Sequence, residues 1–276
     1  MAALTMPGPS PRRPRAGRDN HAVIDEYLER LFGLTGRLAM VTGGNAGIGR
    51  AIAAALGRAG AELILVARDE EALARTAAEL TAEGVSAHQF SVDLADRAAI
   101  DELTARVPRV DILVNAAGVN IRPPLAELST ADWDRTMAVN LTAPYLLGQH
   151  FGPGMAARGF GRIITVTSQQ AVRAYGNSGG YGASKAGAAG LIRSQAEAWS
   201  RHGVCCNAIS PGVVHTAMTE AIFADPERAR AMAERTMVGR NGEPDDFAAA
   251  AVFLASAGAA HVTGQTIFID GGFSVH

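Results

Sequence analysis

The chain has 276 residues, of which 48% are hydrophobic and 19% are charged, a composition typical of a soluble globular protein with a substantial core. Its formal net charge of −2 argues against nucleic acid or an anionic membrane surface as a partner, and no apolar stretch reaches the roughly 18 residues of a membrane helix. The two cysteines are adjacent and the seven histidines lack metal-ligand spacing, so we expect a reducing, cytoplasmic location and no bound metal.

The first 33 residues differ from the rest of the chain. Residues 1–19 hold four prolines and four arginines, which predicts a disordered basic tail rather than a targeting peptide, because there is no apolar core stretch. Residues 20–33 predict an amphipathic helix that Asn20 caps and Gly33 ends. Its apolar stripe is expected to pack either on the body of the protein or on another subunit.

From residue 34 to residue 276, apolar runs alternate with alanine-rich helical segments and predict one α/β domain. The predicted strands cover residues 38–42, 62–67, 86–93, 111–117, 162–168, 204–210 and 265–270. The clearest helical segments cover residues 49–59, 70–83 and 131–158. Because most of these strands are continuously apolar, we expect a doubly wound parallel sheet of seven strands, buried on both faces.

A glycine-rich turn, TGGNAGIG at residues 42–49, joins the first predicted strand to a helix. Glycines let the backbone approach a pyrophosphate closely, and the helix N-terminus offers free N–H groups and a positive field. The spacing differs from the common GxGxxG pattern, and a plain strand-to-helix turn is the alternative interpretation. Its position favours a dinucleotide site built from Gly43, Asn45, Gly47, Ile48 and Gly49.

The end of the second predicted strand bears on which dinucleotide is bound. An acidic residue there would bind a ribose 2′-hydroxyl, and an arginine would accommodate a 2′-phosphate. Arg68 occupies this position, so we predict NADP in preference to NAD. A shift of one residue would place Asp69 there and favour NAD instead.

Several motifs occur in an order that resembles the short-chain dehydrogenase/reductase family over about residues 34–276. They are TGGNAGIG at 42–49, Val92-Asp93-Leu94, NAAG at 115–118, Asn140, Ser168, YGASK at 181–185 and SPGVVHT at 210–216. The resemblance implies a Rossmann-type fold, a nicotinamide cofactor and a homotetramer. It also implies cofactor contacts, beyond those of the glycine turn, from Asp93, Leu94, Asn115, Ala116, Gly118, Tyr181, Lys185, Pro211, Gly212, Val214 and Thr216.

The same resemblance implies that Ser168, Tyr181 and Lys185 perform the chemistry, with Asn140 holding a proton-relay water near Lys185. A tyrosine has an ordinary pKa near 10, and an ammonium about 4 Å away would supply roughly 4 kcal/mol, enough to lower that pKa by about three units. We therefore expect Tyr181 to act as general acid and base and Lys185 as its electrostatic partner. Ser168 would hydrogen-bond the substrate oxygen from the end of the fifth strand.

The substrate is less well defined by the sequence. NAAGVNIRPPL and the ending IDGGFSVH are similar to the family's sugar-acid and polyol dehydrogenases, such as gluconate 5-dehydrogenase, and 3-oxoacyl-carrier-protein reductases are an alternative. Arg122 and His215 are candidates for substrate contact or for plain surface loops, and residues 216–240 resemble a lid. A different class, a catalytically silent dinucleotide-binding regulatory protein, would usually lack the tyrosine or the lysine.

Overall fold

The computed structural model describes residues 20–276, and the predicted basic tail at residues 1–19 lies outside the described residues. Seven strands form one parallel sheet in the order β3-β2-β1-β4-β5-β6-β7. They are β1 (Leu38–Thr42), β2 (Glu62–Ala67), β3 (Ala87–Ser91), β4 (Ile112–Asn115), β5 (Gly161–Val166), β6 (Val204–Pro211) and β7 (Thr266–Ile269). This confirms the predicted doubly wound sheet, and its strand order reverses between β1 and β4, where α/β proteins bind ligands.

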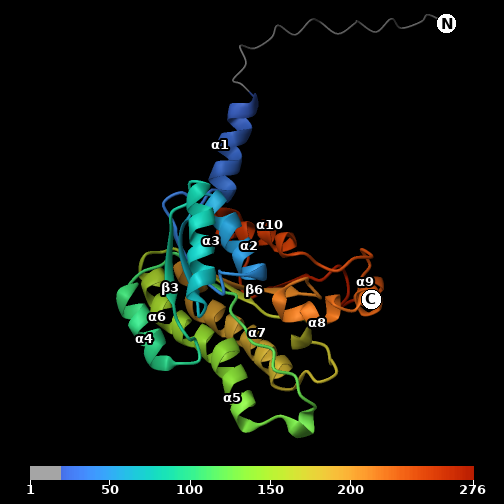
Figure 1. Ribbon diagram of the computed structural model, residues 1–276. Helices are drawn as coiled ribbons and strands as arrows, with labels where there is room; N and C mark the ends of the chain where they lie inside the picture. The colour runs from blue at the N-terminus through green and yellow to red at the C-terminus, as the bar shows by residue number, and fades with distance from the viewer. Residues whose placement is uncertain (1–19) are drawn as a thin grey trace, which may run out of the picture.

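Helices cover both faces of the sheet (Figure 1). They are α1 (Asn20–Phe32), α2 (Gly47–Arg58), α3 (Glu70–Ala82), α4 (Arg97–Arg106), α5 (Thr130–Met137), α6 (Ala143–Ala157), α7 (Gly179–Trp199), α8 (Glu220–Phe223), α9 (Pro226–Glu234) and α10 (Ala248–Ala255). Helices α2, α3 and α10 bury their apolar residues against one face, and α4, α6 and α7 against the other. Successive strand residues point to opposite faces, so Val41 joins the first core and Met40 the second.

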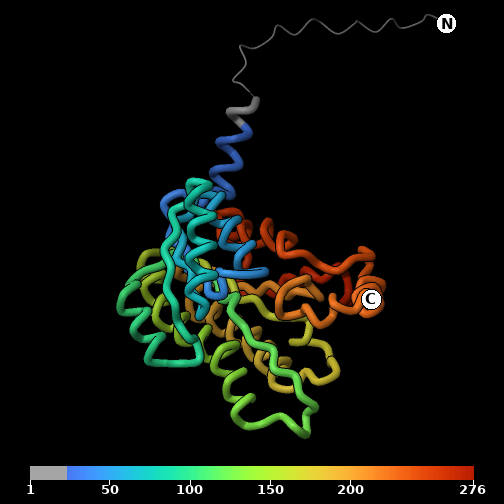
Figure 2. The backbone as a smooth tube through the Cα atoms, in the orientation of Figure 1, coloured from blue at the N-terminus to red at the C-terminus, as the bar shows by residue number. Residues whose placement is uncertain are grey.

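Helix α1 stands away from the body of the protein, as the backbone trace shows (Figure 2). Its Ile24, Tyr27 and Leu28 side chains are 53%, 52% and 46% exposed. Only the end of the helix, near Leu31 and Phe32, reaches the turn around residue 258. Nothing among residues 20–276 therefore buries these three residues of the predicted apolar stripe. None of the described helices is long and apolar enough to cross a membrane.

The helix predicted over residues 131–158 is interrupted. Between α5 and α6 the chain makes a wider π turn over Ala138–Thr142, and Asn140 lies within it, 1% exposed. Such a turn is frequent at functional sites. It brings the Asn140 side chain to the backbone of Val119, with which it exchanges two hydrogen bonds of 2.9 Å.

Several strands end earlier than the sequence predicted. The predicted ranges 86–93, 111–117 and 162–168 shorten to Ala87–Ser91, Ile112–Asn115 and Gly161–Val166. Burial continues beyond the last strand residue, since Thr167 and Ser168 are only 2% and 7% exposed, so an apolar pattern alone overestimates strand length. The residues after each strand form the loops that line the cleft.

Candidate active site

A cleft with two compartments opens at the carboxyl ends of the strands. One compartment has a volume of about 420 Å³ and the other about 400 Å³, and they share Gly43, Asn45, Ala117 and Gly118. The first holds the predicted chemical residues and the second lies beside the end of β2. Of the residues predicted for catalysis or cofactor binding, all line the cleft except Asn115 and Asn140.

The glycine turn has no room for side chains at Gly43 and Gly49. Gly43 has a φ of +70°, and a Cβ there would lie 2.8 Å from the backbone nitrogen of Ala117. A Cβ on Gly49 would collide with the carbonyl oxygen of Gly43. Helix α2 begins here, and its N-cap residue Ala46 makes no side-chain cap. The first N–H groups of α2 are therefore available to an anion such as a phosphate.

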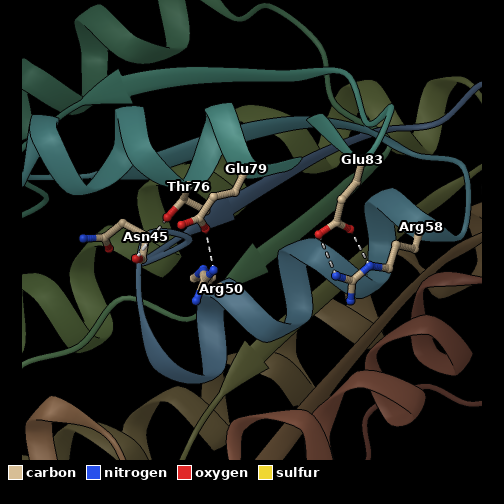
Figure 3. A network of polar contacts seen from close by, with 6 residues as sticks. All are labelled: Asn45, Arg50, Arg58, Thr76, Glu79 and Glu83. Carbon is tan, nitrogen blue, oxygen red and sulfur yellow. Dashed lines mark hydrogen bonds and ion pairs between the residues drawn. The ribbon is translucent and has the colours of Figure 1, made fainter. Parts of the chain in front are cut away.

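Helix α3 supports this turn through polar contacts with α2 (Figure 3). The Thr76 hydroxyl, 3% exposed, donates to the carbonyl oxygen of Asn45 at 3.3 Å. Arg50 pairs with Glu79. Arg58 donates two hydrogen bonds, of 2.8 and 3.0 Å, to Glu83, the residue directly after α3. Arg50 therefore faces Glu79 and lines neither compartment of the cleft.

Arg68 and Asp69, at the second compartment, have different roles. Asp69 caps α3, and its Oδ1 accepts a bond of 2.9 Å from the backbone nitrogen of Ala72. Arg68 lines the compartment and pairs with no carboxylate among residues 20–276. Asp93 and Leu94 face it from the loop after β3. Burial opposes ionisation of Asp93, but bonds from a backbone N–H and from Arg135 lower its pKa overall.

Asn115 and Asn140 act behind the cleft surface rather than on it. The Asn115 side chain, at the end of β4, donates to the Thr165 hydroxyl on β5 at 3.3 Å. The Asn140 side chain also donates to Ser184 at 3.0 Å, so protein groups take both amide hydrogens and one of the two bonds that its oxygen can accept. Asn140 and Lys185 approach each other around Gly118, where a Cβ would lie 3.4 Å from Asn140 Oδ1 and 3.5 Å from Lys185 Nζ.

Ser168, Tyr181 and Lys185 come together in the first compartment. Ser168 lies two residues beyond β5 and caps a short turn, accepting a bond of 3.2 Å from the nitrogen of Gln170. Tyr181 and Lys185 lie one turn apart on α7 and are 7% and 4% exposed. The Lys185 ammonium donates to the carbonyl oxygen of Val166 at 2.7 Å and lies 5.7 Å from the centre of the Tyr181 ring.

The protonation of this pair differs from the expectation. Burial raises the pKa of Tyr181, and the Ser168 hydroxyl and the positive charge of Arg122 only partly oppose that rise. Burial also lowers the pKa of Lys185 to about 8. The predicted lowering of the tyrosine pKa by the lysine was therefore wrong for the protein alone, because removing both groups from water penalises both charges. Tyr181 is a neutral phenol, ready to donate a proton.

Polar residues between the motif positions Ser168 and Tyr181 line the cleft although the sequence interpretation gave them no role. Gln169 directly follows Ser168, and Tyr175 lies in the loop between Ser168 and Tyr181; both line the first compartment. Their position between two motif residues was the available signal. Arg122 lines the same compartment, whereas His215 does not and instead stacks on Phe223, with ring centres 4.2 Å apart.

Residues of the predicted lid cover the first compartment. Met218, Ile222 and Arg228 line its wall, from the turn before α8, from α8 and from α9. Thr216, predicted to contact the cofactor, lies at the start of this segment, with its methyl group facing Gly47. The segment therefore joins the glycine turn to the substrate end of the cleft.

Comparison with known proteins identifies the family. A family model described as enoyl-(acyl carrier protein) reductase matches residues 43–274. The chain belongs to the short-chain dehydrogenase/reductase family. The family's gluconate 5-dehydrogenase from Gluconobacter oxydans is 38% identical over 249 residues, which cover 89% of this chain and 97% of that relative. The D-threitol dehydrogenase of Mycolicibacterium smegmatis is 40% identical over 248 residues, covering 88% and 95% of the two chains.

The solved structures lead to the same family. The crystal structure of a gluconate 5-dehydrogenase from Burkholderia cenocepacia in complex with NADP and tartrate superimposes with a TM-score of 0.83 at 38% identity. The match covers 90% of this chain and 98% of that one. As a short-chain dehydrogenase/reductase, the protein is an NAD(P)-dependent oxidoreductase. The glycine turn, the uncapped α2 N-terminus and the two joined compartments fit an extended dinucleotide.

Proposed function

We propose that the protein interconverts a ketone and a secondary alcohol of a small, oxygen-rich substrate, a sugar acid or a polyol, with NADP as its preferred cofactor. The observation that carries this proposal is that Ser168, Tyr181 and Lys185 lie in one compartment, which continues past the glycine turn into a second compartment beside Arg68 and Asp93. When bound, the nicotinamide supplies or accepts the hydride. The cofactor would lie along the glycine turn and Gly118, with its adenosine end near Arg68, Asp93 and Leu94.

The buried side chains divide the proton chemistry among them. In the reduction direction, the neutral Tyr181 hydroxyl donates its proton to the ketone oxygen, which Ser168 holds by a hydrogen bond. The Lys185 ammonium stabilises the phenolate that this transfer leaves behind. Asn140 fixes the loop at Val119 and the start of α7 through Ser184, and a water near Lys185 would return the proton from solvent.

The nature of the relatives supports the substrate class. The two curated relatives described above are named for a sugar acid and a polyol, and the neighbouring crystal structure holds tartrate, a hydroxy acid. A 3-oxoacyl-carrier-protein reductase is the second candidate. A catalytically silent regulatory protein is disfavoured because all of the predicted chemical residues are present.

A paired turnover screen tests the proposal. The full-length protein is assayed with NADPH and with NADH against 5-keto-D-gluconate, L-sorbose and an acetoacetyl thioester, and with NADP⁺ and NAD⁺ against D-gluconate and D-threitol. We expect turnover of hydroxylated substrates with NADPH. Turnover of the thioester alone would select the reductase alternative, and cofactor binding without any turnover would select the silent binder.

The cofactor preference depends on Arg68. Replacing Arg68 with alanine is expected to raise KM for NADPH by about 10–100-fold, because a charge-assisted bond to the 2′-phosphate is lost, and to change KM for NADH by less than about threefold. Arg50→Ala is the matched control, since Arg50 is paired with Glu79 beside the same turn. Equal changes for both cofactors in Arg68→Ala would contradict the assignment.

We also propose a homotetramer, as the family resemblance implies, located in the cytoplasm, as the lack of a disulfide framework in the sequence favours. Strand β7 lies at the edge of the sheet and Phe268 on it is 38% exposed, which leaves this edge open to a second copy. Light scattering is expected to give four times the chain mass of 28.6 kDa. A mass of a single chain would contradict it.

A further inference from the structure

We propose that the Tyr175 hydroxyl, held in place by Gln169, binds a carboxylate of the substrate, so that this enzyme acts on a sugar acid in preference to the matching polyol. The inference rests on the proposed function, because it names the substrate within the class given there. Tyr175 and Gln169 lie in the chain between Ser168 and Tyr181 and line the same compartment.

Gln169 leaves the Tyr175 hydroxyl with a proton to donate. The Gln169 amide nitrogen donates to the Tyr175 oxygen at 2.9 Å. A tyrosine hydroxyl has one proton, so accepting this bond leaves that proton for another acceptor. Gln169 is 2% exposed, and its amide oxygen has no partner among residues 20–276. An amide buried with an unpaired oxygen is costly, which suggests that its orientation towards Tyr175 serves the site.

Three further contacts fix the position of Tyr175. Its ring stacks on Phe273 near the C-terminus, with ring centres 6.1 Å apart and planes at 25°. Arg122 donates to the carbonyl oxygen of Gly176 at 2.6 Å and to that of Asn177 at 3.4 Å, which ties down the loop beyond Tyr175. A donor fixed in this way loses little freedom when a ligand binds, as a preorganised site requires.

The charges around Tyr175 favour an anionic acceptor. Arg235, Arg173 and Arg122 are close enough for their positive charges to act on its hydroxyl, although burial still raises the pKa of Tyr175 and keeps it neutral. No carboxylate among residues 20–276 pairs with any of these three arginines. The compartment itself is lined by Arg122 and Arg228 and by no aspartate or glutamate, so a neutral hydroxyl donor there suits a carboxylate better than a neutral hydroxyl group.

Tyr175→Phe tests this inference, because it removes the hydroxyl and keeps the ring that packs on Phe273. The substrates are 5-keto-D-gluconate and L-sorbose, which differ in that a CH₂OH group of L-sorbose replaces the carboxylate. We expect the variant to lose about 10–100-fold in kcat/KM for 5-keto-D-gluconate and less than about threefold for L-sorbose. Gln169→Met should show the same selectivity with a smaller loss, seen mainly in KM.

Two controls separate this effect from general damage. Gln195→Met changes another glutamine, which is 5% exposed, whose amide oxygen also has no partner among residues 20–276 and which does not line the compartment. Tyr145→Phe removes a hydroxyl from a tyrosine that is 43% exposed outside the compartment. Neither variant is expected to change the ratio of kcat/KM for 5-keto-D-gluconate to kcat/KM for L-sorbose. An equal loss for both substrates in Tyr175→Phe, or no loss for either, would overturn the inference.

A binding measurement decides the inference even if the proposed function fails. With NADPH present, D-gluconate is expected to raise the melting temperature of the wild type more than D-sorbitol does, and Tyr175→Phe should abolish that difference. If the wild type turns over neither substrate but still shows the difference, the proposed reaction is wrong and the carboxylate site stands. If turnover occurs and D-gluconate raises the melting temperature no more than D-sorbitol does, the carboxylate site is wrong and the reaction stands.

Discussion

Tyr181→Phe is expected to lower kcat for ketone reduction by about 10²–10⁴-fold, the range that a positioned general acid contributes. The phenyl ring fills the space of the buried tyrosine, which is 7% exposed, so the fold and the cleft should be preserved. NADPH affinity should change far less than kcat, because the glycine turn and Arg68 are untouched and Tyr181 is only one of the expected cofactor contacts. Absorbance assays give kcat, and quenching of protein fluorescence gives the dissociation constant.

The pH dependence provides an independent check on Tyr181. Reduction requires the protonated phenol, and burial raises the pKa of Tyr181, so this group imposes no loss of activity near neutral pH. Activity is expected to fall as pH rises through about 8, where the Lys185 ammonium loses its proton and no longer stabilises the phenolate.

A Tyr181→Phe variant that keeps more than a tenth of the activity would show that the proton comes from another group.

Much of this site was predictable because the motif residues follow strands whose ends meet at one edge. The seven apolar runs gave the sheet, and the parallel arrangement places the ends of β1, β4, β5 and β6 side by side. Gly43, Ser168 and Pro211 therefore line one cleft although they are far apart in sequence. The pattern could not place Asn115, whose side chain turns into the sheet towards Thr165 instead of into the cleft.

Features that depend on three-dimensional packing were not predictable. The π turn at Asn140 arises from contacts with Val119 and Ser184, which lie 21 and 44 residues away in sequence. The Tyr175 ring stacks on Phe273, almost a hundred residues further along the chain, so no local sequence pattern identifies Tyr175 as a site residue. The protonation of Tyr181 and Lys185 depends on burial, which a helical spacing of four residues does not reveal.

Lys185 is the only lysine in the sequence, where every other basic side chain apart from histidine is arginine. An ammonium can lose its proton when it is buried, whereas a guanidinium effectively cannot. A lysine that burial has shifted to a pKa of about 8 therefore titrates close to the working pH range, which a buried arginine would not do. Protein labelled with ¹³C at lysine Cε should give a single signal, and its titration would measure the pKa of Lys185 directly.

Lys185→Met is expected to lower kcat by about 10²-fold or more and at the same time to stabilise the fold. The pKa of Lys185 falls from 10.5 to about 8 on folding, so burying its charge costs about 3 kcal/mol at pH 7. Methionine removes that cost. It also removes the hydrogen bond to the Val166 carbonyl, and this loss destabilises the fold by about 1 kcal/mol. The free energy of unfolding should therefore rise by about 2 kcal/mol at pH 7.

The sign of the pH dependence distinguishes this effect from ordinary repacking. Between about pH 8 and 10.5 the unfolded chain binds more protons at Lys185 than the folded one, so wild-type stability should rise with pH. The methionine variant lacks this group, and its advantage should shrink over the same range. Urea unfolding at a fixed protein concentration measures both proteins, because subunit association also contributes to stability.

Lys185→Arg is the matched control for the charge. Arginine remains ionised when buried, so it should not show the gain in stability that methionine shows, and its remaining activity should not fall as pH rises through about 8. A methionine variant that is less stable than the wild type at pH 7 would mean that the Lys185 ammonium contributes more through its bond to Val166 than its burial costs. A stabilising substitution that abolishes turnover is the behaviour expected of a residue kept for chemistry at the expense of the fold.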